Sequence, residues 1–224
     1  MSLTSQLAEF VAGPAGEQQQ SGFAIAPGIV TNPIDLTGEG RVQVRVPTLP
    51  SFEPWARLAG VGGGPGRGFY WAPQKDDEVL VAFNQNDERD AYCLCGLWST
   101  LDRPPTDLPT DAVNKRLIKT GIAGAPGHEV EFDDLLQSIK ITSSTQQEVE
   151  IDPQKIKLST TGGTLSLTMD VATQTISIES TLNLNLKAVG KVSIEGAQVE
   201  IKGLNVNMQA TGPCQVQGLP VKIN

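Results

Sequence analysis

The sequence of 224 residues is poor in histidine, cysteine and aromatic residues, and these shortages exclude several kinds of site. Three cysteines, Cys93, Cys95 and Cys214, cannot form a complete disulfide framework, so we expect free thiols in a reducing compartment. Cys93 and Cys95 form a C-x-C pattern, but two thiols with one distant histidine do not complete a tetrahedral zinc site. The sequence therefore predicts no bound metal and no cofactor.

Long apolar runs and an excess of positive charge are also missing. No segment has the length and apolar character of a membrane span, and no basic stretch precedes an apolar one as in a secretion signal. We therefore expect a soluble protein made without such a signal. The net charge is −8, and residues 40–99 carry six basic and seven acidic side chains. This balance argues against nucleic acid as a partner.

Aromatic residues are distributed unevenly along the chain. Apart from Phe132, every aromatic residue lies at or before Trp98. The remaining apolar residues after Trp98 are almost all Val, Ile, Leu and Met. This change in composition predicts an aromatic-rich globular part followed by a second part of a different kind.

The segment from Gly40 to Ser99 has the pattern of a small all-β domain. Five short stretches alternate with a period of two, and glycine, proline or polar turns separate them. These stretches are Arg41–Val46, Trp55–Val61, Gly68–Ala72, Glu78–Phe83 and Tyr92–Trp98. They predict a five-stranded OB-type barrel, because closure pairs the strands that would otherwise be exposed edges. Phe23–Val30 is also strand-like, and we expect it to enter the barrel or to lie across it.

The chain after Ser138 repeats short groups of alternating aliphatic residues about every seven to eleven residues, with glycine, proline or aspartate turns between them. One such strand cannot bury its apolar side alone, whereas three identical chains supply one strand each to every layer. We therefore predict a trimeric, intertwined β-helical stalk. A monomeric β-sandwich is the alternative that the pattern leaves open.

These patterns divide the chain into four parts. Residues 1–22 form an N-terminal arm, which is either a docking element or a frayed terminus. Residues 23–99 form the OB domain, and residues 100–126 form an extended, proline-rich connector. Residues 127–224 form the trimeric β-helix.

Three clusters could be mistaken for catalytic or ligand sites. His128 lies near Glu129 and two aspartates, but no nucleophile accompanies it, so we interpret it as a turn or packing residue. Asp76–Glu78 is interpreted as a charged turn, not a metal site. Gly60–Gly68 lacks the Lys-Ser/Thr ending and following helix of a phosphate loop, and is interpreted as a hairpin loop. We therefore predict that the protein is not an enzyme.

Two sets of residues form recognisable motifs. One set is Gly40, Arg41, Val42, Val44, Pro47, Trp55, Ala56, Arg57, Pro73, Asp77, Glu78, Val79, Leu80, Val81, Phe83, Tyr92, Leu94, Gly96, Leu97 and Trp98. The other is Gly127–Asp134, with the pattern G-H-x-hydrophobic-x-x-D-D. The first set, apart from Cys95 in front of Gly96, resembles the OB domain of the contractile-tail spike family, which includes phage baseplate assembly protein V and the VgrG proteins. The second resembles the element at the start of their β-helical stalk.

The resemblance implies the central spike of a contractile injection particle, such as a phage tail, a tailocin or an extracellular injection system. Such a homotrimer assembles in the cytoplasm, joins the hub and inner tube at its N-terminal and OB end, and pierces the target envelope mechanically. No histidine follows His128, so the chain cannot build a His-x-His metal apex. The resemblance therefore implies a PAAR-like cap, for which we predict a binding tip at Leu219, Val221 and Ile223.

A different class of function also fits the barrel. OB folds can act as ligand-binding modules for single-stranded nucleic acids or glycans. That function predicts a basic groove lined with exposed aromatic residues. The even charge balance of residues 40–99 argues against it.

Overall fold

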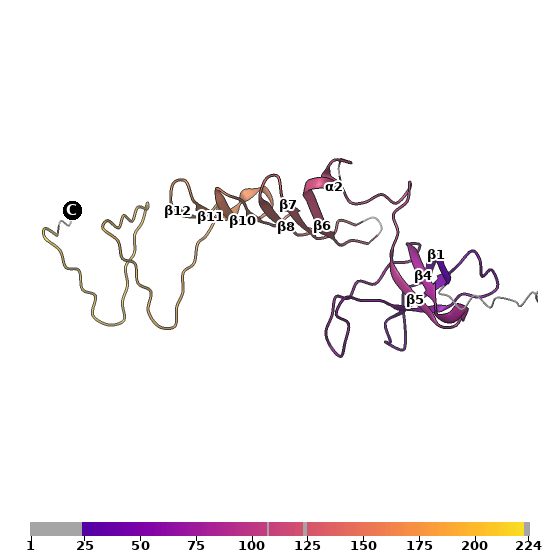
Figure 1. Cartoon of the computed structure of the whole chain (residues 1–224). Helices are drawn as coiled ribbons and strands as arrows, with labels where there is room; N and C mark the ends of the chain where they lie inside the picture. The colour runs from indigo at the N-terminus through magenta and orange to yellow at the C-terminus, as the bar shows by residue number, and fades with distance from the viewer. Residues whose placement is uncertain (1–23, 107, 123–124, 222–224) are drawn as a thin grey trace, which may run out of the picture. The chain divides into compact units, whose positions relative to one another are not determined.

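A computed structural model describes residues 24–106, 108–122 and 125–221 of the chain (Figure 1). All regular structure except short helical turns is β-strand, as the sequence predicts. The strands form a closed barrel and a separate seven-stranded sheet, and residues 180–224 make up a second compact unit. The predicted arm, residues 1–22, lies outside the described residues. None of the helices within the described ranges is long and apolar enough to cross a bilayer.

The barrel contains five strands, as predicted. They are β1 (Ala24–Asn32), β2 (Arg41–Arg45), β3 (Trp55–Leu58), β4 (Glu78–Phe83) and β5 (Ala91–Gly96). The order around the barrel is β1-β2-β3-β5-β4, and β1 closes it by pairing with both β2 and β4. The pair β3 and β5 is parallel and the other pairs are antiparallel. A single 3-10 turn, η1 (Asn84–Asn86), begins the connection from β4 to β5.

Valine fills the inside of the barrel. The fully buried side chains include Val30, Val42, Val44, Val79 and Val81, and they alternate with more exposed neighbours along β2 and β4. Beta-branched side chains suit this position because they pack well on a pleated surface and lose little rotamer freedom there. The alternation of apolar and polar residues that predicts these strands therefore corresponds to side chains that point alternately into and out of the barrel.

One predicted strand is wrong, because Gly68–Ala72 lies in the loop that joins β3 to β4. Its predicted place in the barrel is taken by β1, which pairs along the length of β4. The loop instead folds back on itself, with an isolated bridge between Gly64 and Arg67 and a 3.0 Å hydrogen bond from the Phe69 N–H to the Val61 carbonyl. The expectation that Phe23–Val30 enters the barrel is confirmed from Ala24 onward.

The second sheet is a seven-stranded meander in which the strands follow their order in the chain. The pairs from β6 to β11 are antiparallel. A short helix, α2 (Asp111–Asn114), precedes the sheet, and a 3-10 turn, η2 (Thr161–Gly163), lies between two of its strands. The strands are β6 (Lys115–Lys119), β7 (Glu129–Asp133), β8 (Ser138–Thr142), β9 (Glu148–Ile151), β10 (Lys155–Ser159), β11 (Leu165–Asp170) and β12 (Thr175–Ser180).

The sheet begins earlier than the sequence indicates. Both α2 and β6 lie inside residues 100–126, which we expected to be an extended connector. Leu117 and Ile118 pair across the sheet with Glu131 and Val130 of β7. A strand with only two apolar residues among lysine and arginine carries too little alternation to be recognised, and its partner strand decides its conformation.

Polar side chains hold the corners between the strands. The Asp133 carboxylate accepts hydrogen bonds from the N–H groups of Leu135 and Leu136, at 3.0 and 2.9 Å. Asp152 and Asp170 do the same at two later corners. Gln137 and Gln174, in the same corners as Asp133 and Asp170, and Gln146, between β8 and β9, have positive φ, between 53° and 62°. Each corner thus satisfies its backbone locally, which allows a regular meander of short strands.

Residues 181–221 contain no strand in their described structure, although the sequence predicts strands there. Their aliphatic residues keep the same i, i+2 spacing as those of β8–β12 and are exposed. A strand needs neighbouring N–H and C=O groups. A single chain supplies none to this segment, so alternation alone does not produce a sheet.

Candidate assembly surfaces

The register of the second sheet brings its aliphatic side chains onto one face in two rows. These rows run across β7, β8, β9, β10 and β11, with one residue from each strand in each row. The first row is Val130, Ile141, Val149, Leu158 and Leu167. The second row is Phe132, Ile139, Ile151, Ile156 and Met169. We refer to these ten residues as the apolar face.

Nothing within the described chain covers the apolar face. Val130, Val149 and Leu167 are half-buried, and the other residues of the apolar face are exposed, from 37% for Ile139 to 45% for Ile141. Isolated exposed aliphatic residues are common in proteins, but two continuous rows over five strands form a patch of the kind that marks an interaction surface. The sheet is therefore incomplete as a single layer.

The opposite face of the sheet is charged and internally paired. Lys115 and Glu131 lie 3.5 Å apart on neighbouring strands, and Lys140 and Glu148 lie 3.0 Å apart. The Coulomb attraction of Glu131 raises the pKa of Lys115 above its ordinary value. Such cross-strand pairs suit a face in contact with water. The sheet therefore has one apolar face that is suited to burial and one charged face that is suited to water.

The predicted tip is described in part. Leu219 is fully exposed and Val221 is half exposed. Ile223 lies outside the described residues. The side chains of Leu219 and Val221 are therefore apolar groups exposed to solvent.

His128 takes part in a turn, in agreement with its interpretation. Its Nδ1 accepts a 3.2 Å hydrogen bond from the Ser144 N–H, and its own N–H donates to Thr120 Oγ1 at 2.8 Å. Asp77 likewise closes a turn, because its carboxylate accepts a 2.7 Å bond from the Gln74 N–H. Both side chains therefore accept a hydrogen bond from a backbone N–H group.

The cysteines are free thiols in the structure, and Cys93 and Cys95 lie on β5. Cys93 is buried, and its burial raises the pKa of the thiol to about 11, while Cys95 is exposed. Among the described residues, no group of three or more His, Cys, Asp and Glu side chains is placed to hold a metal ion.

Sequence reasoning missed one surface, which we call the aromatic loop, residues 59–77. Phe69, Tyr70 and Trp71 are all exposed, and the rings of Phe69 and Trp71 stack with centroids 5.6 Å apart and planes 9° apart. The incorrect strand assignment hid this surface, because a strand would have buried alternate residues. The signal that could have revealed it is three consecutive aromatic residues after a glycine-rich turn.

Comparison with known proteins identifies the barrel. Residues 26–98 match the family described as the Type VI secretion system/phage-baseplate injector OB domain. The match spans β1 to β5 from Ala26 onward and confirms the resemblance of the OB-domain residues, and it does not extend to Gly127–Asp134. No curated protein matches the chain. The barrel is thus similar to the OB domains of baseplate injectors, and this similarity is limited to residues 26–98.

Proposed function

We propose that the protein is the trimeric central spike of a contractile injection particle, such as a phage tail, a tailocin or an extracellular injection system. The match of residues 26–98 supports the baseplate context. The observation that carries the finer proposal is the apolar face, which stays open over a sheet whose other face is adapted to water.

Three copies of the sheet, with their apolar faces turned inward, would close into a prism with a packed aliphatic core. Aliphatic side chains suit such a core, since three symmetry-related aromatic rings would not fit around a narrow axis. Phe132, on β7 near the start of the sheet, is the only aromatic residue on the apolar face. Seven strands spaced about 4.8 Å apart give a prism on the order of 30 Å long.

Residues 181–221 would extend this prism as an intertwined β-helix. Their alternating aliphatic residues have no partner strands within the chain, and Gly190, Gly196, Gly203 and Gly212 separate them into short groups. Two further chains would supply the missing backbone donors and acceptors in every layer. The same segments would then bury their aliphatic residues on the axis.

A stalk of this kind performs mechanical work and needs no catalytic chemistry. In this proposal the OB end joins the hub and inner tube, and contraction of a sheath drives the stalk through the target envelope. The predicted tip, Leu219, Val221 and Ile223, binds a PAAR-like cap, which covers the open backbone edge of the last layer. The protein is neither an enzyme nor a metal carrier.

A ligand-binding OB module is the second candidate, and the exposed aromatic loop is the observation in its favour. Such a module works as a monomer and does not use the apolar face. The two candidates therefore differ in their predicted oligomeric state.

The test combines the mass of the full chain in solution with hydrogen exchange of its backbone amides. The spike proposal predicts three times the protomer mass of 23.8 kDa, and slow exchange in residues 181–221. Slow exchange there would report pairing between chains, since the single chain offers these amides no partner strands. A monomer would overturn the trimer, and a trimer with fast exchange in residues 181–221 would overturn the intertwined stalk.

A further inference from the structure

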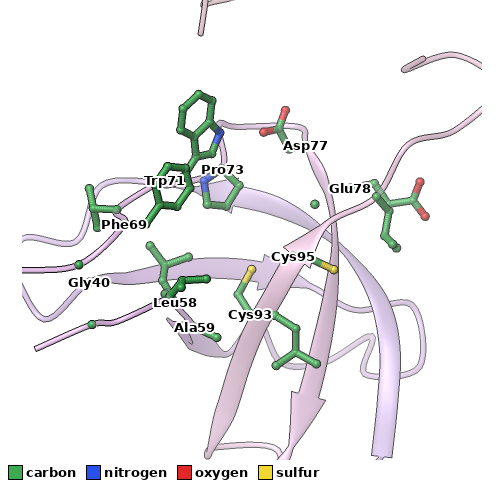
Figure 2. Close-up of a pocket in the computed structure, with 18 of the residues that line it drawn as sticks. Gly40, Leu58, Ala59, Phe69, Trp71, Pro73, Asp77, Glu78, Cys93 and Cys95 are labelled. Atoms are coloured by element: carbon green, nitrogen blue, oxygen red, sulfur yellow. The ribbon is translucent and has the colours of Figure 1, made fainter. Parts of the chain in front are cut away.

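A cavity of about 1140 Å³ lies beside the aromatic loop. Figure 2 shows Trp71 and Pro73 on one side of it and Leu58 and Cys93 on the other. Cys95 also lines the cavity and is exposed. The walls thus combine apolar and aromatic side chains with charged ones, as in sites that bind a partner group.

The aromatic wall is held in place by the backbone of its loop. The Phe69 N–H donates a backbone hydrogen bond to the Val61 carbonyl. Gly68 has a φ of +128°, which residues with a side chain rarely adopt. A Cβ atom at Gly68 would lie only 2.8 Å from the Cα atom of Gly63, so the two chain segments touch. The rings of Phe69 and Trp71 are therefore presented on a preformed loop, which reduces the entropy lost on binding.

The rim of the cavity carries carboxylates, although that of Asp77 already accepts a hydrogen bond from the Gln74 N–H. Asp77, Glu78 and Asp102 all line the cavity, and the described contacts include no ion pair for any of them. A fourth carboxylate, Glu39, is already paired with Arg41 at 3.1 Å.

Two arginines also line the cavity and reduce its negative charge. The Arg67 guanidinium lies over its own loop, since a Cβ atom at Gly64 would come within 2.8 Å of its Nε. The Arg103 Nε donates a long, 3.5 Å hydrogen bond to the Thr100 carbonyl. Aromatic faces with carboxylates in the same cavity favour a guanidinium or ammonium group, through cation–π attraction and ion pairing together.

We propose that this cavity docks a basic segment of a neighbouring baseplate protein, which inserts an arginine between the aromatic wall and Asp77 and Glu78. Arginine fits better than lysine because its planar group stacks on aromatic rings. This proposal goes beyond the spike function, and it concerns the barrel alone.

The test uses a fluorescein-labelled peptide, Gly-Ser-Gly-Leu-Arg-Leu-Gly-Ser-Gly, and the full-length protein in fluorescence anisotropy titrations. Matched peptides carry Gln or Glu in place of Arg. We expect saturable binding of the Arg peptide and binding at least about tenfold weaker for the Glu peptide. Trp71→Ala should weaken binding of the Arg peptide by about tenfold, and Trp71→Phe should restore most of it.

Two controls distinguish the cavity from other surfaces. Phe52→Ala removes an exposed aromatic residue that does not line the cavity, and should leave binding unchanged. In a Cys214→Ser background, the Arg peptide should slow alkylation of Cys95, which lines the cavity, whereas the Glu peptide should not.

Equal binding of the Arg and Glu peptides, no saturable binding, or binding unaffected by Trp71→Ala would overturn the proposal. Self-association that Trp71→Ala abolishes would overturn it too, because a second copy of the chain would then be the occupant. None of these results depends on the trimer mass or on exchange in residues 181–221, so failure of this proposal and failure of the spike proposal are distinguishable.

Discussion

Met169→Asp is the substitution that tests the inward orientation of the apolar face most directly. Met169 lies opposite Ile156 in the second row of this face and is 40% exposed in the single chain. The adjacent residue on the same strand, Thr168, lies on the charged face opposite Lys157. Thr168→Asp therefore introduces the same carboxylate one residue away, on the side that the proposal leaves in water.

The two substitutions should differ greatly in their effect on the trimer. Burying a methionine completely contributes about 1.5–3 kcal/mol, so covering its remaining exposed 40% contributes about 0.6–1.2 kcal/mol per chain. A buried carboxyl group without a partner costs about 3 kcal/mol or more. With three substituted side chains in one layer, the free energy of association becomes less favourable by about 10 kcal/mol in all. The association constant then falls by a factor of roughly 10⁷. Thr168→Asp gains at most an exposed ion pair, which contributes about 0.2–1 kcal/mol.

Sedimentation equilibrium across protein concentration measures both variants against the unsubstituted chain, and thermal denaturation measures their stability. We expect Met169→Asp to sediment as a monomer at concentrations where Thr168→Asp remains a trimer. The charged form of the new carboxyl group is disfavoured on the axis, so acidification should partly restore the Met169→Asp trimer. A Met169→Asp protein with the mass and melting temperature of the unsubstituted chain would refute the inward orientation.

Two further predictions concern a corner of the sheet and the tip of the stalk. Backbone hydrogen bonds from Leu136 and Leu135 to the buried Asp133 hold the pKa of its carboxyl group below the ordinary value of about 3.9. Its stabilising contribution is therefore complete above about pH 4 and is lost as the pH falls through the lower, folded-state pKa. Asp133→Asn should lower the melting temperature at pH 7, with a difference that shrinks below pH 4, whereas a pH-independent difference would contradict this reasoning. Deletion of residues 220–224 should abolish binding of a PAAR-type protein without changing the trimer mass, and normal binding by the deletion variant would remove the tip from the proposal.

The barrel shows how far alternation predicts structure. The alternation in β2 and β4 corresponds to inside and outside positions, because each buried valine has a polar or less buried neighbour. Gly68–Ala72 alternates equally well but forms a loop. Alternation shows only that a segment is compatible with a half-buried strand. The position beside β4 is occupied by β1, so Gly68–Ala72 has no place in the barrel. The aromatic loop and its cavity were missed for this reason.

Residues 115–221 show which features the sequence determines alone and which depend on tertiary structure. Side-chain alternation and polar corner residues determine that residues 129–180 form short strands with one aliphatic side, because both effects act within a few residues. Pairing brings Lys115–Lys119 into the sheet, since that segment has little alternation of its own. Residues 181–221 have the alternation without the pairing, and they form no strand in the described chain. The reason is that a β-strand is stabilised by hydrogen bonds to a neighbour, and the neighbour is a property of the folded or assembled structure, not of the local sequence.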